Sequence, residues 1–177
     1  TNGKTLHSNS HSAVEIGHTK VIDSQTQCYC GAKGCLETEI SIPQLIKKAQ
    51  HLAQENPTSI LNQYPITVET LCDAVLIGDK QALDIINLVA QRLGFILAVM
   101  VNIFNPQKIL IGSPLCRAKS TLFPLILSSI QHHVLPRYAH NLVIEETELR
   151  NKGTLPAASL VKEALYNGSL LLELMQG

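Results

Sequence analysis

The sequence lacks an excess of charge of either sign. Across 177 residues, 14 lysines and arginines balance 14 aspartates and glutamates, so the formal net charge is zero. Affinity for phosphates comes mostly from accumulated positive charge, and the balance therefore argues against a strongly basic DNA- or RNA-binding domain within this stretch. It also excludes an acidic tail and a polybasic membrane anchor.

Long apolar runs are missing as well. The longest extends from Leu93 to Val101, about half of what a membrane-spanning helix needs. The polar start of the chain has no apolar stretch behind it, unlike a signal peptide. We therefore expect a cytoplasmic protein without a membrane partner. Because no methionine begins the chain, we also expect a fragment or processed product with further function upstream.

The composition is that of a folded domain. Apolar residues make up 45% of the chain and charged residues 16%, which excludes an intrinsically disordered polypeptide. The length fits one domain or one lobe of a larger fold. Apolar residues recur at helical spacing from Ala82 to Phe104, and short apolar runs at 108–111 and 142–144 are typical of strands, the first of them buried. Strands that alternate with long helices predict an α/β architecture.

Further helices are expected on either side of these elements. Ser41 and Gln44 form a capping-box pattern that predicts a helix to about residue 54. Thr67 is expected to begin a helix that ends at Gly78. Two more helices are predicted from Ser120 to about 135 and from 154 to 166.

Five cysteines are present, and three of them fall within eight residues. An odd number in this arrangement is unlike a disulfide framework, and clustered thiols in a reducing compartment indicate a metal site. The candidate ligands, in the pattern H-x9-C-x-C-x4-C, are His18, Cys28, Cys30 and Cys35. Three thiolates and an imidazole complete a tetrahedral zinc site without an open position, so the zinc would be structural. The alternative is a loop histidine beside free thiols.

Two carboxylates flank this candidate site. Glu15 lies three residues before His18, and Glu37 lies two residues after Cys35. A closed metal loop would hold both in nearly fixed positions. Carboxylates accept hydrogen bonds from vicinal hydroxyls such as those of a sugar ring, so the shared anchoring of Glu15 and Glu37 favours a sugar-binding role for the two acids. The alternative is that each acid is a solvated surface charge.

These residues resemble the signature of the ROK family (repressors, open reading frames and sugar kinases). The resemblance is carried by Glu15-Ile16-Gly17-His18 and by the segment 28–37, CYCGAKGCLE. It extends to NIFNPQKI at 102–109 and LVKEA at 160–164, and so over essentially the whole chain. Within the family it is closest to the C-terminal half of the regulators of amino-sugar metabolism.

The resemblance implies an actin-like, ribonuclease-H-like sugar kinase fold, of which residues 1–177 would form the second, C-terminal lobe with its zinc-binding loop. It also implies that the residues matching His18, Cys28, Cys30 and Cys35 hold Zn²⁺, and that those matching Glu15, His18 and Glu37 contact sugar hydroxyls. Family regulators bind operator DNA through an upstream helix-turn-helix, respond to a sugar phosphate such as N-acetylglucosamine 6-phosphate, and form homodimers or homotetramers through this half.

The sequence also departs from the family pattern. Ser8, His11 and Val14 stand where the family usually has glycines, and Val14 adds bulk where a sugar would approach. Altered or lost effector binding is therefore an alternative that the sequence leaves open.

Three functions compete at this point. The first is the effector-binding and oligomerisation part of a non-enzymatic ROK transcriptional regulator. The second is a lobe of a ROK sugar kinase, whose catalytic aspartate and phosphate-binding loop would have to lie upstream. The third is a zinc-stabilised module that binds another protein.

Overall fold

The computed structural model describes residues 15–21, 23–148, 162, 166 and 175. Its longer helices are α2 (Ile42–Glu55), α3 (Val68–Leu76), α4 (Lys80–Phe104) and α5 (Lys119–Gln131). Its short helices are α1 (Glu37–Ile40) and α6 (Pro136–Ala139), with the 3₁₀ turns η1 (Ile16–His18), η2 (Ile60–Asn62) and η3 (Pro114–Ala118). Its strands are β1 (Lys108–Ile111) and β2 (Val143–Glu146).

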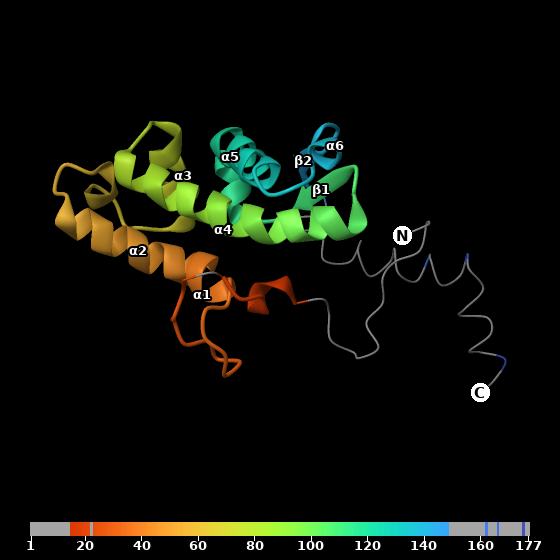
Figure 1. Ribbon diagram of the computed structural model, residues 1–177. Coiled ribbons are helices and arrows are strands. Elements are labelled where there is room, and N and C mark those ends of the chain that lie inside the picture. The colour runs from red at the N-terminus through yellow and green to blue at the C-terminus, as the bar shows by residue number, and fades with distance from the viewer. Residues whose placement is uncertain (1–14, 22, 149–161, 163–165, 167–174, 176–177) are drawn as a thin grey trace.

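The long helix α4 is the centre of the fold. It packs against α5, α3, α2 and α1, with α2 along one side and α3 and α5 along the other (Figure 1). Its apolar stripe continues for most of its length, as the sequence predicts, so that it buries residues toward several neighbours. The largest fully buried side chains of this core include Leu45, Leu71, Ile85, Ile86, Leu122 and Ile126. Burial of a side chain of this size contributes about 1.5–3 kcal/mol.

The two strands confirm the predicted α/β class. β1 pairs with β2 in parallel, with Ile109 opposite Ile144. Parallel neighbours need a crossover connection, which η3, α5 and α6 provide. The prediction that β1 is a buried strand is wrong for the described residues, because exposed and half-buried residues alternate along it and Leu110 is 58% exposed.

The observed helix ends test the caps and end points that the sequence predicts. Thr67 begins α3 with a capping box. The Thr67 hydroxyl accepts a hydrogen bond from the Thr70 backbone N–H, and the Thr70 hydroxyl accepts one from the Thr67 backbone N–H. The capping box predicted at Ser41 is wrong, since the Ser41 side chain makes no capping hydrogen bond at the start of α2. The helix predicted to reach residue 135 ends at Gln131 instead, and Pro136 begins α6. The predicted helix at 154–166 lies outside the described residues.

α4 meets the criteria of length and composition for a membrane span, and it is the one helix in the described part of the chain that does. Half of its most apolar window is nevertheless buried inside the protein. A core helix of a folded domain has the same properties, so this is weak evidence for a membrane span.

A glycine sets the distance between α4 and α5. A Cβ atom on Gly94 would lie 2.5 Å from both Cβ and Oγ of Ser129 and 3.2 Å from the Ile126 carbonyl oxygen. The two helices therefore approach each other more closely here than any residue with a side chain would permit.

Asp79 joins two parts of the chain at the start of α4. One carboxylate oxygen accepts from the Ala82 backbone N–H at 3.0 Å, and the other accepts from the Ser59 hydroxyl at 2.9 Å and the Ile60 N–H at 3.0 Å. Partial burial opposes ionisation of Asp79, but these hydrogen bonds outweigh it and lower the pKa of the carboxyl below its ordinary 3.8.

We expect Asp79→Ala to lower the free energy of unfolding by about 1–2 kcal/mol, because α4 loses its N-cap and the buried Ser59 loses its acceptor. Asp79 contributes fully above its ordinary pKa, and the contribution disappears as the pH falls through the lowered value in the folded state. Urea titrations between pH 3 and 7 measure both effects, with the exposed Asp84→Ala on the same helix as the control. Equal losses from the two variants at pH 7 would contradict the prediction.

Candidate metal and ligand site

The segment from Thr19 to Leu36 folds back on itself and brings the clustered cysteines together. The Leu36 N–H donates to the Thr19 carbonyl at 2.9 Å, and the Val21 N–H donates to the Gly34 carbonyl at 2.6 Å. An inner bridge pairs Gln27 with Lys33. The loop is attached to the helices by a small cluster of buried residues, Val21, Leu36 and Ile96, separate from the main core.

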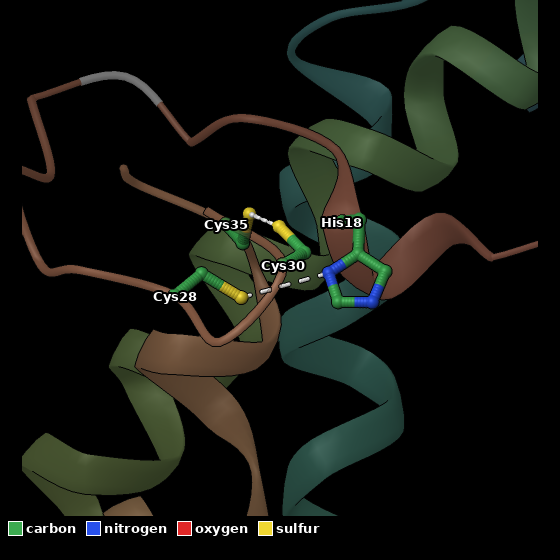
Figure 2. Close-up of side chains that lie close together, drawn as sticks. All are labelled: His18, Cys28, Cys30 and Cys35. Carbon is green, nitrogen blue, oxygen red and sulfur yellow. Dashed lines mark hydrogen bonds between the residues drawn. The ribbon is translucent and has the colours of Figure 1, made fainter. Parts of the chain in front are cut away.

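The four predicted metal ligands meet at one point of this loop (Figure 2). One potential ligand atom from each of His18, Cys28, Cys30 and Cys35 lies within 4.8 Å of every other. The Cys28 Sγ is 3.6 Å from the His18 Nδ1, and the Cys30 Sγ is 3.7 Å from the Cys35 Sγ. The prediction that these residues gather is confirmed.

The separations fit a tetrahedral metal site. Bonds of about 2.3 Å to sulfur and 2.0–2.1 Å to nitrogen place two sulfurs about 3.8 Å apart, and a sulfur and a nitrogen about 3.6 Å apart, in a tetrahedron. The Cys30–Cys35 and Cys28–His18 distances agree with these values, and the ligand atoms of all four residues lie within 4.8 Å of one another. A set of three sulfurs and one imidazole suits zinc and leaves no position for a reacting water.

The thiols differ in how readily they ionise. Burial, followed by hydrogen bonding to Cys30 and Cys28, raises the pKa of Cys35 to about 12. A hydrogen bond from the Ala32 backbone holds the pKa of the exposed Cys30 below its ordinary value. A metal binds thiolates, so a cation that enters this site must displace the Cys35 proton.

The second nitrogen of His18 faces a group of oxygen atoms. Its Nε2 lies 3.1 Å from a Glu15 carboxylate oxygen, 3.8 Å from a Glu37 carboxylate oxygen and 3.0 Å from the Tyr29 hydroxyl. The three predicted sugar-binding residues are thus together on the side of the ring that points away from the cysteines. With Nδ1 given to a metal, Nε2 must carry the proton and act as a donor.

Local structure explains how the two acids converge. Glu15 precedes η1, the turn that carries His18, and Glu37 is the first residue of α1, directly after the loop closes. Gly17 lies in η1 beside His18, and a Cβ atom on Gly17 would be 3.6 Å from the Cβ atom of Glu37. Both carboxylates are partly exposed, Glu15 at 59% and Glu37 at 40%, so they remain accessible to a solute.

Tyr29 is the member of this group that the sequence analysis did not predict. It stands between Cys28 and Cys30, and its ring meets that of His18 edge to face at 5.1 Å. Its position inside the C-x-C motif was the available signal, because a residue between two ligands of one ion lies close to the third.

Other cysteines and histidines have structural roles. Cys72 is fully buried in the core with Leu71 and Val75. His132 and His133 each place Nδ1 against the carbonyl oxygen four residues earlier, at 2.6 and 2.8 Å, so both rings satisfy carbonyl groups at the end of α5. The family departures at residues 8, 11 and 14 lie outside the described residues.

The sequence is similar to known proteins over its whole length. Residues 1–164 match the profile of the ROK family. The chain is 50% identical over 177 residues to the DNA-binding transcriptional repressor Mlc of Escherichia coli, and 33% identical over 176 residues to the DNA-binding transcriptional dual regulator NagC of the same species. It is 32% identical over 169 residues to a glucokinase of Halalkalibacterium halodurans. The match covers 100%, 99% and 92% of this chain respectively.

The chain is shorter than these relatives. It spans 44% of Mlc, 43% of NagC and 51% of the glucokinase. Among solved structures, it superposes on a ROK family transcriptional regulator homologous to Mlc with a TM-score of 0.82, at 36% identity, covering 92% of this chain and 41% of the other. A ROK glucokinase from Streptomyces griseus aligns with a TM-score of 0.68 at 23% identity, over 79% of this chain and 48% of the other, and shows the shared fold alone.

Proposed function

The chain belongs to the ROK family, and we propose that it is the effector-binding and oligomerisation part of a transcriptional regulator of sugar metabolism. The two relatives with the highest identities named above are transcriptional regulators. The chain also shares the actin-like sugar kinase fold of ROK regulators and kinases, which fits the family and does not separate the two functions. Within that fold, residues 1–177 correspond to the C-terminal lobe.

The observation that carries the proposal is that the two ring nitrogens of His18 face different groups. Its Nδ1 lies among three cysteine sulfurs, and its Nε2 lies beside two carboxylates. In the proposed site a zinc ion, held by His18, Cys28, Cys30 and Cys35, would supply only rigidity. The ring would then donate a hydrogen bond from Nε2, while Glu15 and Glu37 accept hydrogen bonds from neighbouring hydroxyls. One donor between two acceptors suits a vicinal diol of a sugar ring.

The effector in this proposal is a sugar phosphate, and an amino-sugar phosphate such as N-acetylglucosamine 6-phosphate is the first to test. Support comes from the 33% identity with NagC and with proteins described as N-acetylglucosamine repressors. The higher identity with Mlc makes glucose and glucose 6-phosphate the necessary comparison. Operator DNA would be bound by an upstream part of the polypeptide, since this stretch carries no net charge. Self-association into dimers or tetramers in the cytoplasm completes the proposal.

The sugar kinase alternative has one observation in its favour, the 32% identity with a glucokinase. Catalysis of phosphoryl transfer requires a base and phosphate-binding groups that the site around His18 does not supply. A kinase would turn over ATP with the sugar that it binds, whereas the proposed regulator would bind the sugar without consuming ATP. A coupled assay for ADP on the intact protein separates the two functions.

We expect Glu37→Gln to weaken sugar binding about 10–100-fold, because a hydrogen bond to a charged acceptor contributes about 1.5–3 kcal/mol. Calorimetric titration of the intact, zinc-loaded protein with N-acetylglucosamine 6-phosphate and with glucose measures the change. Glu55→Gln serves as the control, because Glu55 lies on α2 and pairs only with His51 at 3.5 Å among the described residues. Absence of binding by the unmodified protein to either class of sugar at millimolar concentration would overturn the proposed function.

A further inference from the structure

The hydroxyl of Tyr29 lies at the place where the proposed site would receive a sugar hydroxyl. It is 3.0 Å from the His18 Nε2, and a Glu37 carboxylate oxygen lies 3.8 Å from the same nitrogen. The Glu15 carboxylate lies 3.1 Å from the same nitrogen. Because the two candidate carboxylates and the Tyr29 hydroxyl all lie beside the His18 Nε2, any ligand that accepts a hydrogen bond from this nitrogen must share the space with Tyr29.

The chemistry of a phenol makes this position meaningful. A hydroxyl group can accept one hydrogen bond from an imidazole N–H and donate another to a carboxylate. When the His18 Nε2 carries the proton, the Tyr29 hydroxyl accepts a hydrogen bond from the ring at 3.0 Å. A sugar hydroxyl bound between His18 and Glu37 would accept the same hydrogen bond and donate to the Glu37 carboxylate, one oxygen of which lies 3.8 Å from Nε2.

Tyr29 is also placed so that it can leave. The residue is 81% exposed, one of the highest values among the large hydrophobic side chains described. The edge-to-face contact with His18 is the one ring contact that the described residues give it. Its backbone lies between two predicted metal ligands and is therefore fixed, while its ring projects into solvent. Rotation of the side chain would open the site without disturbing the metal loop.

We propose that Tyr29 is a gate for the sugar site, whose hydroxyl occupies the position of a ligand hydroxyl and must be displaced before a sugar can bind. This inference rests on the proposed function. It makes Tyr29 a residue that sets affinity and selectivity. Only a ligand whose hydrogen bonds to His18 and Glu37 are stronger than the one between His18 and the phenol would displace the Tyr29 hydroxyl.

Two substitutions distinguish the effect of the Tyr29 hydroxyl on sugar binding from the effect of the ring. Tyr29→Phe removes the competing hydroxyl and keeps the ring, whereas Tyr29→Ala removes both. We expect each to tighten the binding of N-acetylglucosamine 6-phosphate, or of glucose if that is the sugar bound, about tenfold in calorimetric titrations of the intact, zinc-loaded protein. Tyr64→Ala is the matched control, because Tyr64 is 64% exposed and lies beside η2, away from this site. Metal content and melting temperature without sugar should be the same in all four proteins.

The outcomes distinguish the gate from the site that it would guard. Tighter binding by both Tyr29 variants, with Tyr64→Ala unchanged, supports the gate. Equal affinity in the unmodified protein and Tyr29→Phe overturns the gate alone. Weaker binding by Tyr29→Ala also overturns it, because Tyr29 would then be a contact for the sugar. Absence of binding in every variant overturns the proposed function itself.

Discussion

Cys35→Ser is expected to abolish stoichiometric metal binding and to cause the largest loss of stability of any single substitution in the loop. The Cys35 side chain is fully buried, and its sulfur lies 3.7 Å from that of Cys30. A serine hydroxyl at this position is a poor zinc ligand and would leave a polar group buried. Structural zinc contributes on the order of 10 kcal/mol in small peptides, so a loss of several kcal/mol is expected here.

The loss should be local before it is global. Three buried residues, Val21, Leu36 and Ile96, attach the loop to the helices, while the main core lies around α4 and does not include the cysteines of the loop. Hydrogen exchange of residues 15–40 should therefore rise first, with α3 to α5 still protected. Elemental analysis of purified, reduced protein measures the metal.

Cys116→Ser is the control, since Cys116 is a buried cysteine outside the cluster. It is expected to lose some stability and to keep its metal. An unchanged melting temperature after complete removal of zinc would contradict a structural metal.

Gly34→Ala is expected to destabilise the loop far more than Gly31→Ala, although both glycines have a positive φ, 75° and 90° respectively. A Cβ atom on Gly34 would lie 2.4 Å from the Ser24 carbonyl oxygen, whereas one on Gly31 would have nothing within 4 Å. The difference isolates the steric effect, because both alanines share the cost of a left-handed conformation, about 1–2 kcal/mol.

Overpacking against a main-chain carbonyl adds about 1–3 kcal/mol for Gly34→Ala. The Gly34 carbonyl also accepts from the Val21 N–H at 2.6 Å, so a shift there would loosen the loop and weaken metal binding. Thermal melts and competition titrations with a zinc chelator measure both effects. Similar losses in stability and zinc affinity from the two variants would show that the Ser24 backbone can move away from the added Cβ atom, which would contradict the prediction.

Much of this site could be predicted because its ligands are close in the sequence. His18, Cys28, Cys30 and Cys35 span 18 residues, so spacing and donor chemistry sufficed to predict that they meet. The placement of Glu15 and Glu37 followed from their neighbours in the chain. Tyr29 was missed because its position in the C-x-C motif predicts only that it lies near the other ligands, and its role depends on where its hydroxyl points.

The fold was predicted well where periodicity is strong and less well where tertiary contacts decide. α4 was predicted to its last residue, since Asp79 and Asn105 mark its ends. Burial of β1 was predicted wrongly, because an apolar run does not reveal which faces of a strand are covered. The missing cap at Ser41 has a similar cause, since a suitable residue pair does not guarantee the side-chain geometry.

The two nitrogens of His18 have a thermodynamic consequence. If one side of the ring belongs to a metal and the other to a sugar, neither equilibrium is independent of the other. Linkage then requires that the factor by which bound zinc raises the affinity for sugar equals the factor by which bound sugar raises the affinity for zinc. A cell short of zinc would, on that account, also have a regulator less sensitive to its sugar.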